Sequence, residues 1–295
     1  MSRPKVSALM SVYNGQRYLE EAVESILNQA FSDFEFIIVN DASTDDTPRI
    51  LKECAKQDKR IRLMRNTHKL GLARSLNKGL RLARGRYIAR QDADDISLPS
   101  RLDLQVRFLE KNPKVGVLGT WVAYIDEKGR PTGIWQPPTS PALVRWSLLF
   151  SNPLAHPSVM MRRSSLEGGV AYKPGLLYSQ DYDLWARLSE KTQLANLPEF
   201  LCLRRVHGRM ATAHRYERQN QTYRMVMQQL YSNLLGEKVP EAFIATLLRA
   251  TRGKFLEKRE ELQLAANLIK RLYKAHTSYG CLLYTSPSPR DRQKS

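Results

Sequence analysis

Cysteine is scarce in this chain of 295 residues, which has only Cys54, Cys202 and Cys281. An odd number of widely spaced cysteines fits neither a disulfide framework nor a zinc site, so we expect a reducing compartment. The chain also lacks any stretch near the ~18–20 uncharged apolar residues of a membrane span. Its first residues lack the apolar region of a signal peptide. We therefore expect a cytoplasmic protein, either in solution or at the inner face of the membrane.

Acidic residues are outnumbered, with 29 Asp and Glu against 47 Lys and Arg and a net charge of +18. Residues 201–280 alone hold 15 Lys and Arg against 6 Asp and Glu. Such a basic segment can bind nucleic acid, anionic lipid or a phosphorylated substrate, and it can equally be a solvated helical surface. The hydrophobic content of 42% and the charged content of 26% are those of an ordinary globular protein.

Short apolar runs alternate with amphipathic segments in the first hundred residues. The runs predict strands at 6–10, 34–39, 61–64 and 87–89. Between them, apolar residues recur at helical spacing. This alternation predicts an α/β fold with a mostly parallel sheet and helices on both faces.

The second half of the chain gives a less regular pattern. After residue 99 a helix follows, and Ser140 is placed to cap a short helix that reaches about residue 150. His156 has no second histidine at metal-ligand spacing, so we expect it to be structural. The remaining predictions are strands at 115–118, 121–125 and 200–206, a turn at 128–129, a loop at 136–141, an apolar run at 158–161, and basic amphipathic helices at 216–235 and 240–275.

Polar clusters follow three of the predicted strands, at residues 11–14, 41–46 and 92–95. The carboxyl ends of parallel strands meet at one edge of a sheet, where ligands bind, so these clusters should lie close together. The last cluster holds three carboxylates within four positions, Asp92, Asp94 and Asp95. Like charges this close repel, and a hard divalent cation such as Mg²⁺ or Mn²⁺ removes that repulsion. An isolated Asp-x-Asp would instead be interpreted as a solvated acidic turn.

The phosphate-binding loops of common nucleotide sites are absent. Neither a Gly-x-Gly-x-x-Gly fingerprint nor a Gly-x-x-x-x-Gly-Lys-Ser/Thr loop occurs. The predicted sheet edge instead offers an aromatic ring, Tyr13, and a carboxylate, Asp41, beside the aspartate triplet. A pyrimidine nucleotide diphosphate could stack on the ring, donate an N–H to Asp41 and leave its phosphates on the cation. Alternatively, Tyr13 packs in the core and Asp41 caps a turn.

Four motifs together resemble the family 2 inverting glycosyltransferases with the GT-A fold. They are SVYNG at 11–15, VNDASTDDT at 39–47, GLARSLNKGL at 71–80 and DADD at 92–95, and the resemblance covers about 6–207. The family implies a nucleotide-sugar donor, a divalent metal (Mn²⁺ or Mg²⁺) and a hydroxyl acceptor, either a glycan or a lipid-linked saccharide.

The resemblance also implies roles by position. Ser11, Tyr13 and Asp41 would hold the nucleobase and Asp94 the ribose. Asp95 would hold the metal and the diphosphate, with Asp92 opening the metal motif. Two departures are Asn40, where the family usually has an aspartate, and Met10, where many members have proline. Neither removes a group that the chemistry requires.

A second chemical motif, YSQDYDLWARL, spans 178–188. Asp181 opens a helix there, so its carboxylate could be an N-cap. The motif resembles the Glu-Asp pair of the family, with Gln180 in the place of the glutamate. In that family the aspartate is the general base, which implies this role for Asp181, with Asp183 as the fallback.

In related enzymes the loop that follows the last strand closes over the diphosphate, which implies contacts from His207 and Arg209. We therefore expect a catalytic GT-A domain at 1–210 and a basic helical extension at 211–280. That extension would pack on the domain or touch an acceptor or a membrane surface. The string CLLYTSPSPRDRQKS at 281–295 resembles translated sequencing-adaptor read-through, and we expect it to be a non-native tail.

The leading hypothesis is an inverting, metal-dependent glycosyltransferase that uses a UDP- or dTDP-sugar in cell-surface polysaccharide, O-antigen or capsule synthesis. A nucleotidyl or phosphoryl transferase would need a lysine or arginine in the first loop, and residues 11–15 have none. A non-catalytic nucleotide or nucleic-acid binder would leave the aspartates unexplained and lacks interleaved aromatic platforms. We expect no nucleic-acid partner.

Overall fold

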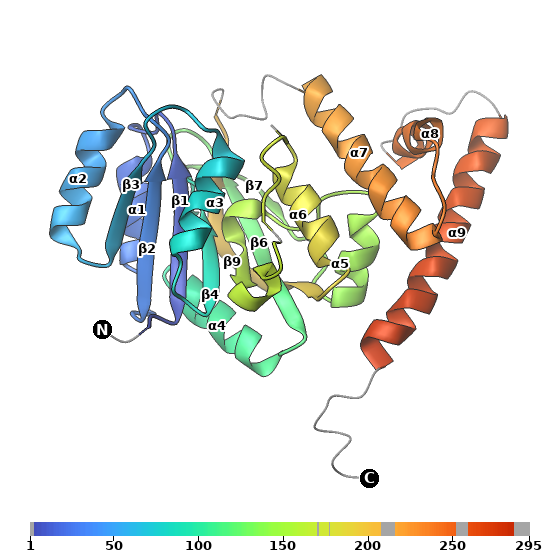
Figure 1. Cartoon of the computed structure of the whole chain (residues 1–295), viewed down its shortest axis with the longest axis horizontal. Helices are drawn as coiled ribbons and strands as arrows, with labels where there is room; N and C mark the ends of the chain where they lie inside the picture. Colours follow the sequence, from blue (N-terminus) through green and yellow to red (C-terminus); the bar gives the residue numbers. More distant parts are fainter. Residues whose placement is uncertain (1–2, 170, 177, 208–215, 252–258, 286–295) are drawn as a thin grey trace, which may run out of the picture.

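The computed structural model describes residues 3–169, 171–176, 178–207, 216–251 and 259–285 (Figure 1). Its first half is a run of parallel strands joined by helices, as the alternating pattern predicted. Every residue of the first two strands is buried, because helices cover both faces of the sheet. The elements are β1 (Val6–Val12), α1 (Leu19–Leu27), β2 (Phe34–Asn40), α2 (Thr47–Gln57), β3 (Ile61–Arg65), α3 (Leu72–Leu82) and β4 (Tyr87–Gln91).

The strand order places a switch point between β1 and β4. The strand order in the sheet is β3-β2-β1-β4-β8-β6-β9-β5. Strands β2 and β3 therefore lie on one side of β1, and β4 and the later strands lie on the other side. Both β2 and β4 pair with β1 in parallel. In open α/β sheets the ligand crevice lies at such a reversal, outside the carboxyl ends of the strands.

The second half extends the same sheet with strands of mixed direction. Strand β8 is antiparallel to both β4 and β6, whereas β9 is parallel to β6. Here the elements are β5 (Ile96–Ser97), α4 (Arg101–Lys111), β6 (Val115–Ile125), β7 (Pro131–Trp135), α5 (Pro141–Leu148), β8 (Met160–Arg162), α6 (Gln180–Leu188) and β9 (Gln193–Arg205). The side chain of Ser140 accepts a hydrogen bond from the Leu143 backbone, so it caps α5 as predicted.

The prediction of two strands at 115–118 and 121–125 was wrong, since β6 is continuous. Gly119 appeared to interrupt it, but a Cβ there would lie 2.2 Å from the Asn196 side-chain oxygen of β9. The glycine therefore permits close approach of the two strands. The pairing of β6 with β9 shifts register next to it, around Thr120 and Trp121. Strand β7 was not predicted.

Two hydrophobic clusters lie on opposite faces of the sheet, and β2 contributes to both by alternation. Phe36 and Ile38 pack with α1, α2 and α4, whereas Ile37 and Val39 pack with α3, α5 and α6. The second cluster continues into buried residues of the C-terminal helices, such as Tyr231. Figure 1 shows these helices at one end of the molecule, beyond α5 and α6. They are α7 (Tyr216–Leu235), α8 (Glu241–Thr251) and α9 (Arg259–Thr285).

The C-terminal helices differ from the expectation in one respect. The range 240–275 holds two helices, α8 and α9, with residues 252–258 outside the described part. Helix α9 ends at Thr285, and the non-native origin of residues 281–295 stays a prediction. Among the described residues, no helix combines the length and the hydropathy needed to cross a bilayer.

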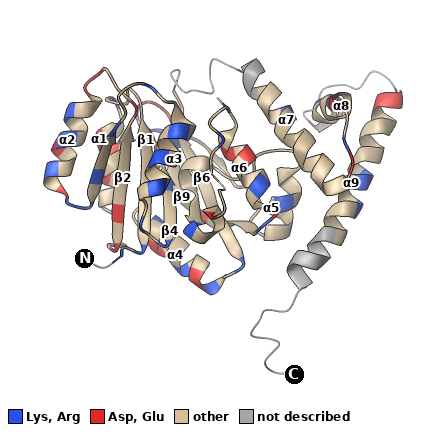
Figure 2. Cartoon of the chain, in the orientation of Figure 1, with Lys and Arg blue, Asp and Glu red and all other residues tan. Residues whose placement is uncertain are grey.

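Charges on the described part of these helices are partly paired. Arg271 lies 2.6 Å from Glu237 and Arg249 lies 2.5 Å from Glu261. Figure 2 shows acidic as well as basic residues along α9. Exposed pairs of this kind add little stability, but they reduce the net charge presented to an anionic surface. Membrane contact through these helices stays a prediction.

Candidate active site

The carboxyl ends of β1, β2 and β4 meet at one edge of the sheet, as expected. A cavity of about 470 Å³ opens beside β4 and is lined by Asp92, Asp94 and Asp95. Asp181, from the start of α6, lines the same cavity. The structure therefore brings the predicted metal motif and the predicted base into one space. Ser11, Tyr13 and Asp41 lie at the same sheet edge, outside the lining of this cavity.

Each aspartate of the triplet is held by a different partner. Asp92 forms an ion pair with the fully buried Arg90. Asp94 lies 3.0 Å from the Nε2 atom of His207, and Asp95 accepts a hydrogen bond of 2.8 Å from the backbone of Arg205. Both of these partners lie at the end of β9 or just after it. The triplet is thus held by contacts from β4 and from the end of β9.

Crowding of the carboxylates changes their pKa values. Burial, followed by the charges of Asp94 and Asp92, raises the pKa of Asp95 well above its usual range. Burial and Asp92 likewise raise the pKa of Asp94. Burial also raises the pKa of Asp92, but Arg90 and other positive charges outweigh it and the net pKa is lowered. The ionised triplet is unfavourable by itself, and a bound cation would stabilise it.

The donor set suits magnesium or manganese held jointly with a ligand. Among the described residues, no group of three or more His, Cys, Asp or Glu side chains is arranged to hold a metal ion. Mg²⁺ in nucleotide enzymes is bound by one or two carboxylates together with substrate phosphates. Asp95 accepts the hydrogen bond of the Arg205 backbone through Oδ1, and it also lines the cavity. The residues present therefore fit a metal that binds with a diphosphate.

Two fully buried arginines, Arg90 and Arg101, hold the end of β4 that leads into the triplet. The sequence did not predict that either of them is buried. Arg101 donates to the backbone oxygen of Arg90 at 2.7 Å and to the side chain of Gln91 at 3.1 Å. Gln91 in turn donates to the backbone oxygen of Asp95 at 2.6 Å. A hydrogen-bonded network of this kind fixes the position of the β4 end. A run such as Arg-Gln-Asp carries no local signal that its arginine is buried.

Asp41 organises the loop that leads into α3. Its carboxylate accepts hydrogen bonds from the Asn66 side chain at 2.7 Å and from the backbones of Leu70 and Gly71, both at 2.8 Å. Burial raises the pKa of Asp41, but these hydrogen bonds outweigh it and lower the pKa overall. Asp41 is therefore ionised at neutral pH. The Ser75 side chain also hydrogen-bonds to this carboxylate, and a bond from a ligand N–H to Asp41 stays a prediction.

Tyr13 is not a core residue, because 42% of it is exposed. The Nζ atom of Lys69 lies 3.5 Å from the centre of its ring. The ring is thus presented at the sheet edge with a cation on one face. Ser11 is buried on β1, opposite Val39 of β2. Core packing is therefore excluded for Tyr13, while its role towards a base stays a prediction.

All three non-glycine residues with left-handed backbone in the described part lie next to candidate residues. They are Asn14 (φ 51°), Ala42 (φ 60°) and Ser179 (φ 55°). Asn14 follows Tyr13, Ala42 follows Asp41, and Ser179 precedes the α6 turn that carries Asp181. Strained backbone collects at functional sites, where the surrounding structure holds it.

Ala42→Gly should relieve such strain. An L-residue in the left-handed region costs roughly 1–2 kcal/mol, and the added entropy of glycine in the unfolded chain offsets about 0.4–1 kcal/mol of it. We expect stability between unchanged and about 1.6 kcal/mol higher, measured by denaturant unfolding. Ala142→Gly, in the exposed first turn of α5, is the control and should lower stability. Equal losses for both variants would show that Ala42 is not strained.

Asp181 is inside the first turn of α6, and the N-cap position belongs to Ser179. Asp181 is therefore not the N-cap residue, although its carboxylate accepts a hydrogen bond from the Tyr182 backbone. Its Oδ2 atom accepts a hydrogen bond of 2.8 Å from the Asn152 side chain. Burial raises the pKa of Asp181, although bonds from Tyr182 and Asn152 act against this. A carboxylate with a raised pKa, oriented by a neighbour at a cavity wall, has the properties of a general base.

Asp183 has a different environment. It is buried and pairs with Lys173 at 2.7 Å and with Arg187 at 2.7 Å. It does not line the cavity. These contacts tie the α6 helix to the preceding loop, so the structure favours Asp181 over the fallback candidate.

Arg204 and His156 line the cavity, and the sequence did not point to either of them. Burial lowers the pKa of Arg204, but the charges of Asp95 and Asp92 outweigh it and keep the guanidinium charged. His156 donates to or accepts from the Tyr172 hydroxyl at 2.8 Å, and burial together with Arg90 lowers its pKa to about 3. It is therefore neutral, in keeping with the structural role expected for it. Arg209 lies outside the described residues.

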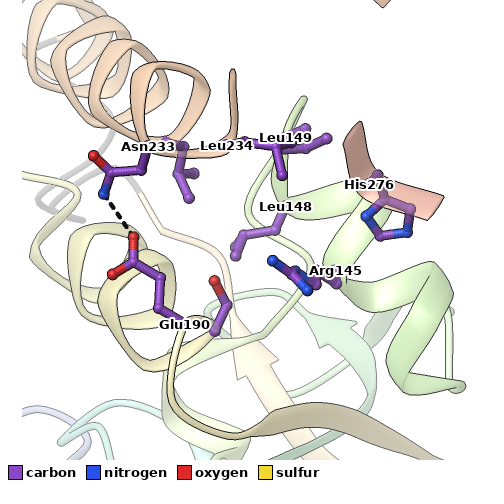
Figure 3. Close-up of a pocket in the computed structure, with 9 residues that line it drawn as sticks. Arg145, Leu148, Leu149, Glu190, Asn233, Leu234 and His276 are labelled. Carbon is purple, nitrogen blue, oxygen red and sulfur yellow. Dashed lines mark hydrogen bonds between the residues drawn. The ribbon is translucent and has the colours of Figure 1, made fainter. Parts of the chain in front are cut away.

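A second cavity, of about 320 Å³, lies between α5, α7, α9 and the end of α6 (Figure 3). Leucines form much of its wall, among them Leu148 and Leu234. Asn233 donates a hydrogen bond of 2.6 Å to Glu190 across one side. None of the predicted site residues lies here, so this cavity is separate from the aspartate site.

Comparison with known proteins agrees with the motifs. The family model described as glycosyl transferase family 2 matches residues 7–169. An uncharacterised glycosyltransferase of Haemophilus influenzae is 34% identical over 79% of this chain and 76% of its own length. The O-antigen biosynthesis glycosyltransferase WbnJ of Escherichia coli is 32% identical over 69% of this chain and 80% of its own.

Two solved structures share the fold at low sequence identity. Staphylococcus aureus TarS 1–349, in complex with UDP-GlcNAc, has a TM-score of 0.65 and 18% identity, covering 92% of this chain and 81% of its own. The mannosyltransferase PcManGT of Pyrobaculum calidifontis, in complex with GDP-Man and Mn²⁺, has a TM-score of 0.58 and 19% identity, covering 97% and 89%. These likenesses confirm the GT-A fold that the sequence predicted.

Proposed function

This chain belongs to glycosyl transferase family 2, and from that premise we propose that it transfers a sugar from a nucleotide diphosphate to a hydroxyl group with inversion. The observation that carries the proposal is the single cavity lined by Asp95, in the turn after β4, and by Asp181 on α6. Inversion needs the base and the leaving diphosphate on opposite faces of the sugar. Two carboxylates that come from separate elements and line one cavity support this assignment.

The donor is held at the carboxyl edge of the sheet. The nucleobase lies on Tyr13 near Ser11 and donates its imide N–H to Asp41, which favours UDP- or dTDP-sugars. The ribose binds Asp94. Asp95, with Asp92, would hold Mn²⁺ or Mg²⁺, and the Mn²⁺ complex of PcManGT, a protein of the same fold, supports this metal. When bound, the cation offsets the charge that develops on the departing diphosphate.

Transfer then needs one proton acceptor and one leaving group. Asp181 takes the proton of the acceptor hydroxyl, whose oxygen forms a bond to the anomeric carbon. The bond from that carbon to the diphosphate oxygen breaks, and its electron pair stays on the diphosphate. Arg204 places a fixed positive charge in the cavity near Asp95, where it stabilises the leaving group. His207 and Arg209 would add contacts from the following segment.

The acceptor is a glycan or a lipid-linked saccharide of cell-surface polysaccharide synthesis. This part of the proposal follows the O-antigen function in the name of WbnJ. It places the reaction in the cytoplasm, at the inner face of the membrane when the acceptor is lipid-linked.

A donor screen tests the proposal. We expect UDP- and dTDP-sugars to raise the melting temperature in the presence of Mn²⁺, and GDP- and CMP-sugars to raise it less, because only uracil and thymine offer the imide to Asp41. The measurement is a thermal shift series with and without Mn²⁺. A preference for GDP-sugars would contradict the base assignment. Absence of any response to all four nucleotides would contradict the donor class as a whole.

A further inference from the structure

Two polar atoms beside Asp181 are buried and make no hydrogen bond within the described part of the chain. They are the Oγ atom of Ser179 and the Oε1 atom of Gln180. Both residues line the reaction cavity. A buried polar atom without a partner is unfavourable, so its presence at a cavity wall points to a ligand that supplies the missing bond. Gln180 Oε1 is only an acceptor, and a ligand must therefore donate to it.

Aromatic side chains form another part of the wall. Trp135 comes from β7, where it pairs with Val122 and packs against the small cluster that contains Ala155 and Cys202. Tyr223 comes from α7 and stacks on Tyr182 at 4.3 Å between ring centres. Both Trp135 and Tyr223 also line the cavity. Packing on one side fixes each ring and leaves its remaining surface for a ligand.

Charge in the cavity disfavours an anionic acceptor. Asp92, Asp94, Asp95 and Asp181 all line it, with Arg204 as a cation among them. Gln180, which directly precedes the proposed base Asp181, is neutral. A carboxylate on the acceptor would add a further negative charge to these four aspartates, and Arg204 already interacts with Asp92, Asp95 and Asp181. A neutral ligand fits this charge, hydroxyl donors on it fit the unpartnered oxygen atoms, and an apolar face fits the two aromatic rings.

We propose that the space between Trp135 and the start of α6 is an acceptor subsite for a neutral saccharide ring. Gln180 and Ser179 hydrogen-bond its hydroxyl groups, and Trp135 and Tyr223 contact its apolar face. The inference rests on the proposed function, since it names the acceptor of the same reaction. It also assigns part of the acceptor specificity to the C-terminal helix α7, through Tyr223.

Binding of simple glycosides tests this subsite without the natural acceptor. The probes are methyl β-glucopyranoside, methyl β-galactopyranoside, the anionic methyl β-glucuronide and the ringless polyol glycerol, each with UDP and Mg²⁺ present. Saturation-transfer NMR on the full chain measures their binding. We expect signals from the neutral glycosides and much weaker ones from the glucuronide and from glycerol. Binding led by the glucuronide, or no glycoside binding at all, would overturn the proposal.

Variants locate the binding. Trp135→Ala should abolish the glycoside signal, whereas Trp135→Phe should keep part of it. Gln180→Met removes a hydrogen bond at constant size and should weaken glycoside binding roughly 3–10-fold. Ile134→Ala is the matched control, because Ile134 is 61% exposed and lies on the opposite face of β7. Equal signals from Trp135→Ala and Ile134→Ala would place the sugar elsewhere.

The same samples separate this inference from the proposed function. A melting-temperature shift with UDP should persist in the Trp135 and Gln180 variants, since the donor lies on the β1, β2 and β4 side. A wild-type protein that ignores UDP would contradict the proposed function. A wild-type protein that binds UDP but no neutral glycoside would contradict only the acceptor subsite.

Discussion

Asp181→Asn is expected to lower turnover by roughly 10²–10⁴-fold, the loss typical for a positioned general base. The substitution keeps the size of the side chain and its contact with Asn152, but it removes the proton acceptor. Folding should be little changed, because Ser179, and not Asp181, is the N-cap of α6. The measurement is release of UDP with a working acceptor, beside a melting curve of the same sample.

Asp183→Asn is the matched control for this prediction. It breaks the ion pairs with Lys173 and Arg187 and should lower the melting temperature. Since Asp183 does not line the cavity, turnover of the folded fraction should stay near wild type. The reverse pattern, with a slow Asp183 variant and a normal Asp181 variant, would move the base to Asp183.

The pH profile of the wild type follows from the same assignment. A base works when it is deprotonated, so the rate should fall as the pH drops through the pKa of Asp181. Because burial raises that pKa, the fall should begin at a higher pH than for an ordinary aspartate. In the Asp181→Asn variant, the residual activity should no longer show this fall at low pH.

Asp95→Asn is expected to abolish turnover and to weaken binding of the nucleotide diphosphate. A neutral amide is a poor ligand for a divalent cation, and the cation joins the diphosphate to the protein. The variant should fold, because it relieves the repulsion that raises the pKa of Asp95. Asp103→Asn, at a partly exposed site on α4, serves as the control and should leave turnover unchanged. Full activity of Asp95→Asn, or of the wild type in EDTA, would show that no metal is needed.

The parallel half of the fold was predictable because its signals are local. Each strand is a compact apolar run, each helix has an apolar face, and the polar cluster follows directly in sequence. Asp92, Asp94 and Asp95 could thus be placed at a sheet edge without any tertiary information. Their position beside β1 comes from the parallel pairing of β4 with β1, which joins segments distant in sequence.

The walls of the cavity were not predictable, because they depend on contacts distant in sequence. Arg204 faces the triplet through the pairing of β9 with β6, which no local pattern encodes. Asn152 reaches Asp181 from a loop, and Trp135 lies on β7, a strand that was not predicted. The choice between Asp181 and Asp183 likewise needed the positions of Lys173 and Arg187. The sequence thus predicted which chemical groups the site contains, whereas their positions around the cavity depend on tertiary packing.

Calorimetric titration of UDP, with and without Mn²⁺, tests the division of the cavity into a donor side and a base side most directly. It compares the wild type, Asp95→Asn and Asp181→Asn at one pH. The account predicts Mn²⁺-dependent binding of UDP to the wild type and to Asp181→Asn with similar affinity, and weak, Mn²⁺-independent binding to Asp95→Asn. Loss of UDP binding in Asp181→Asn, together with normal Mn²⁺-dependent binding in Asp95→Asn, would contradict it.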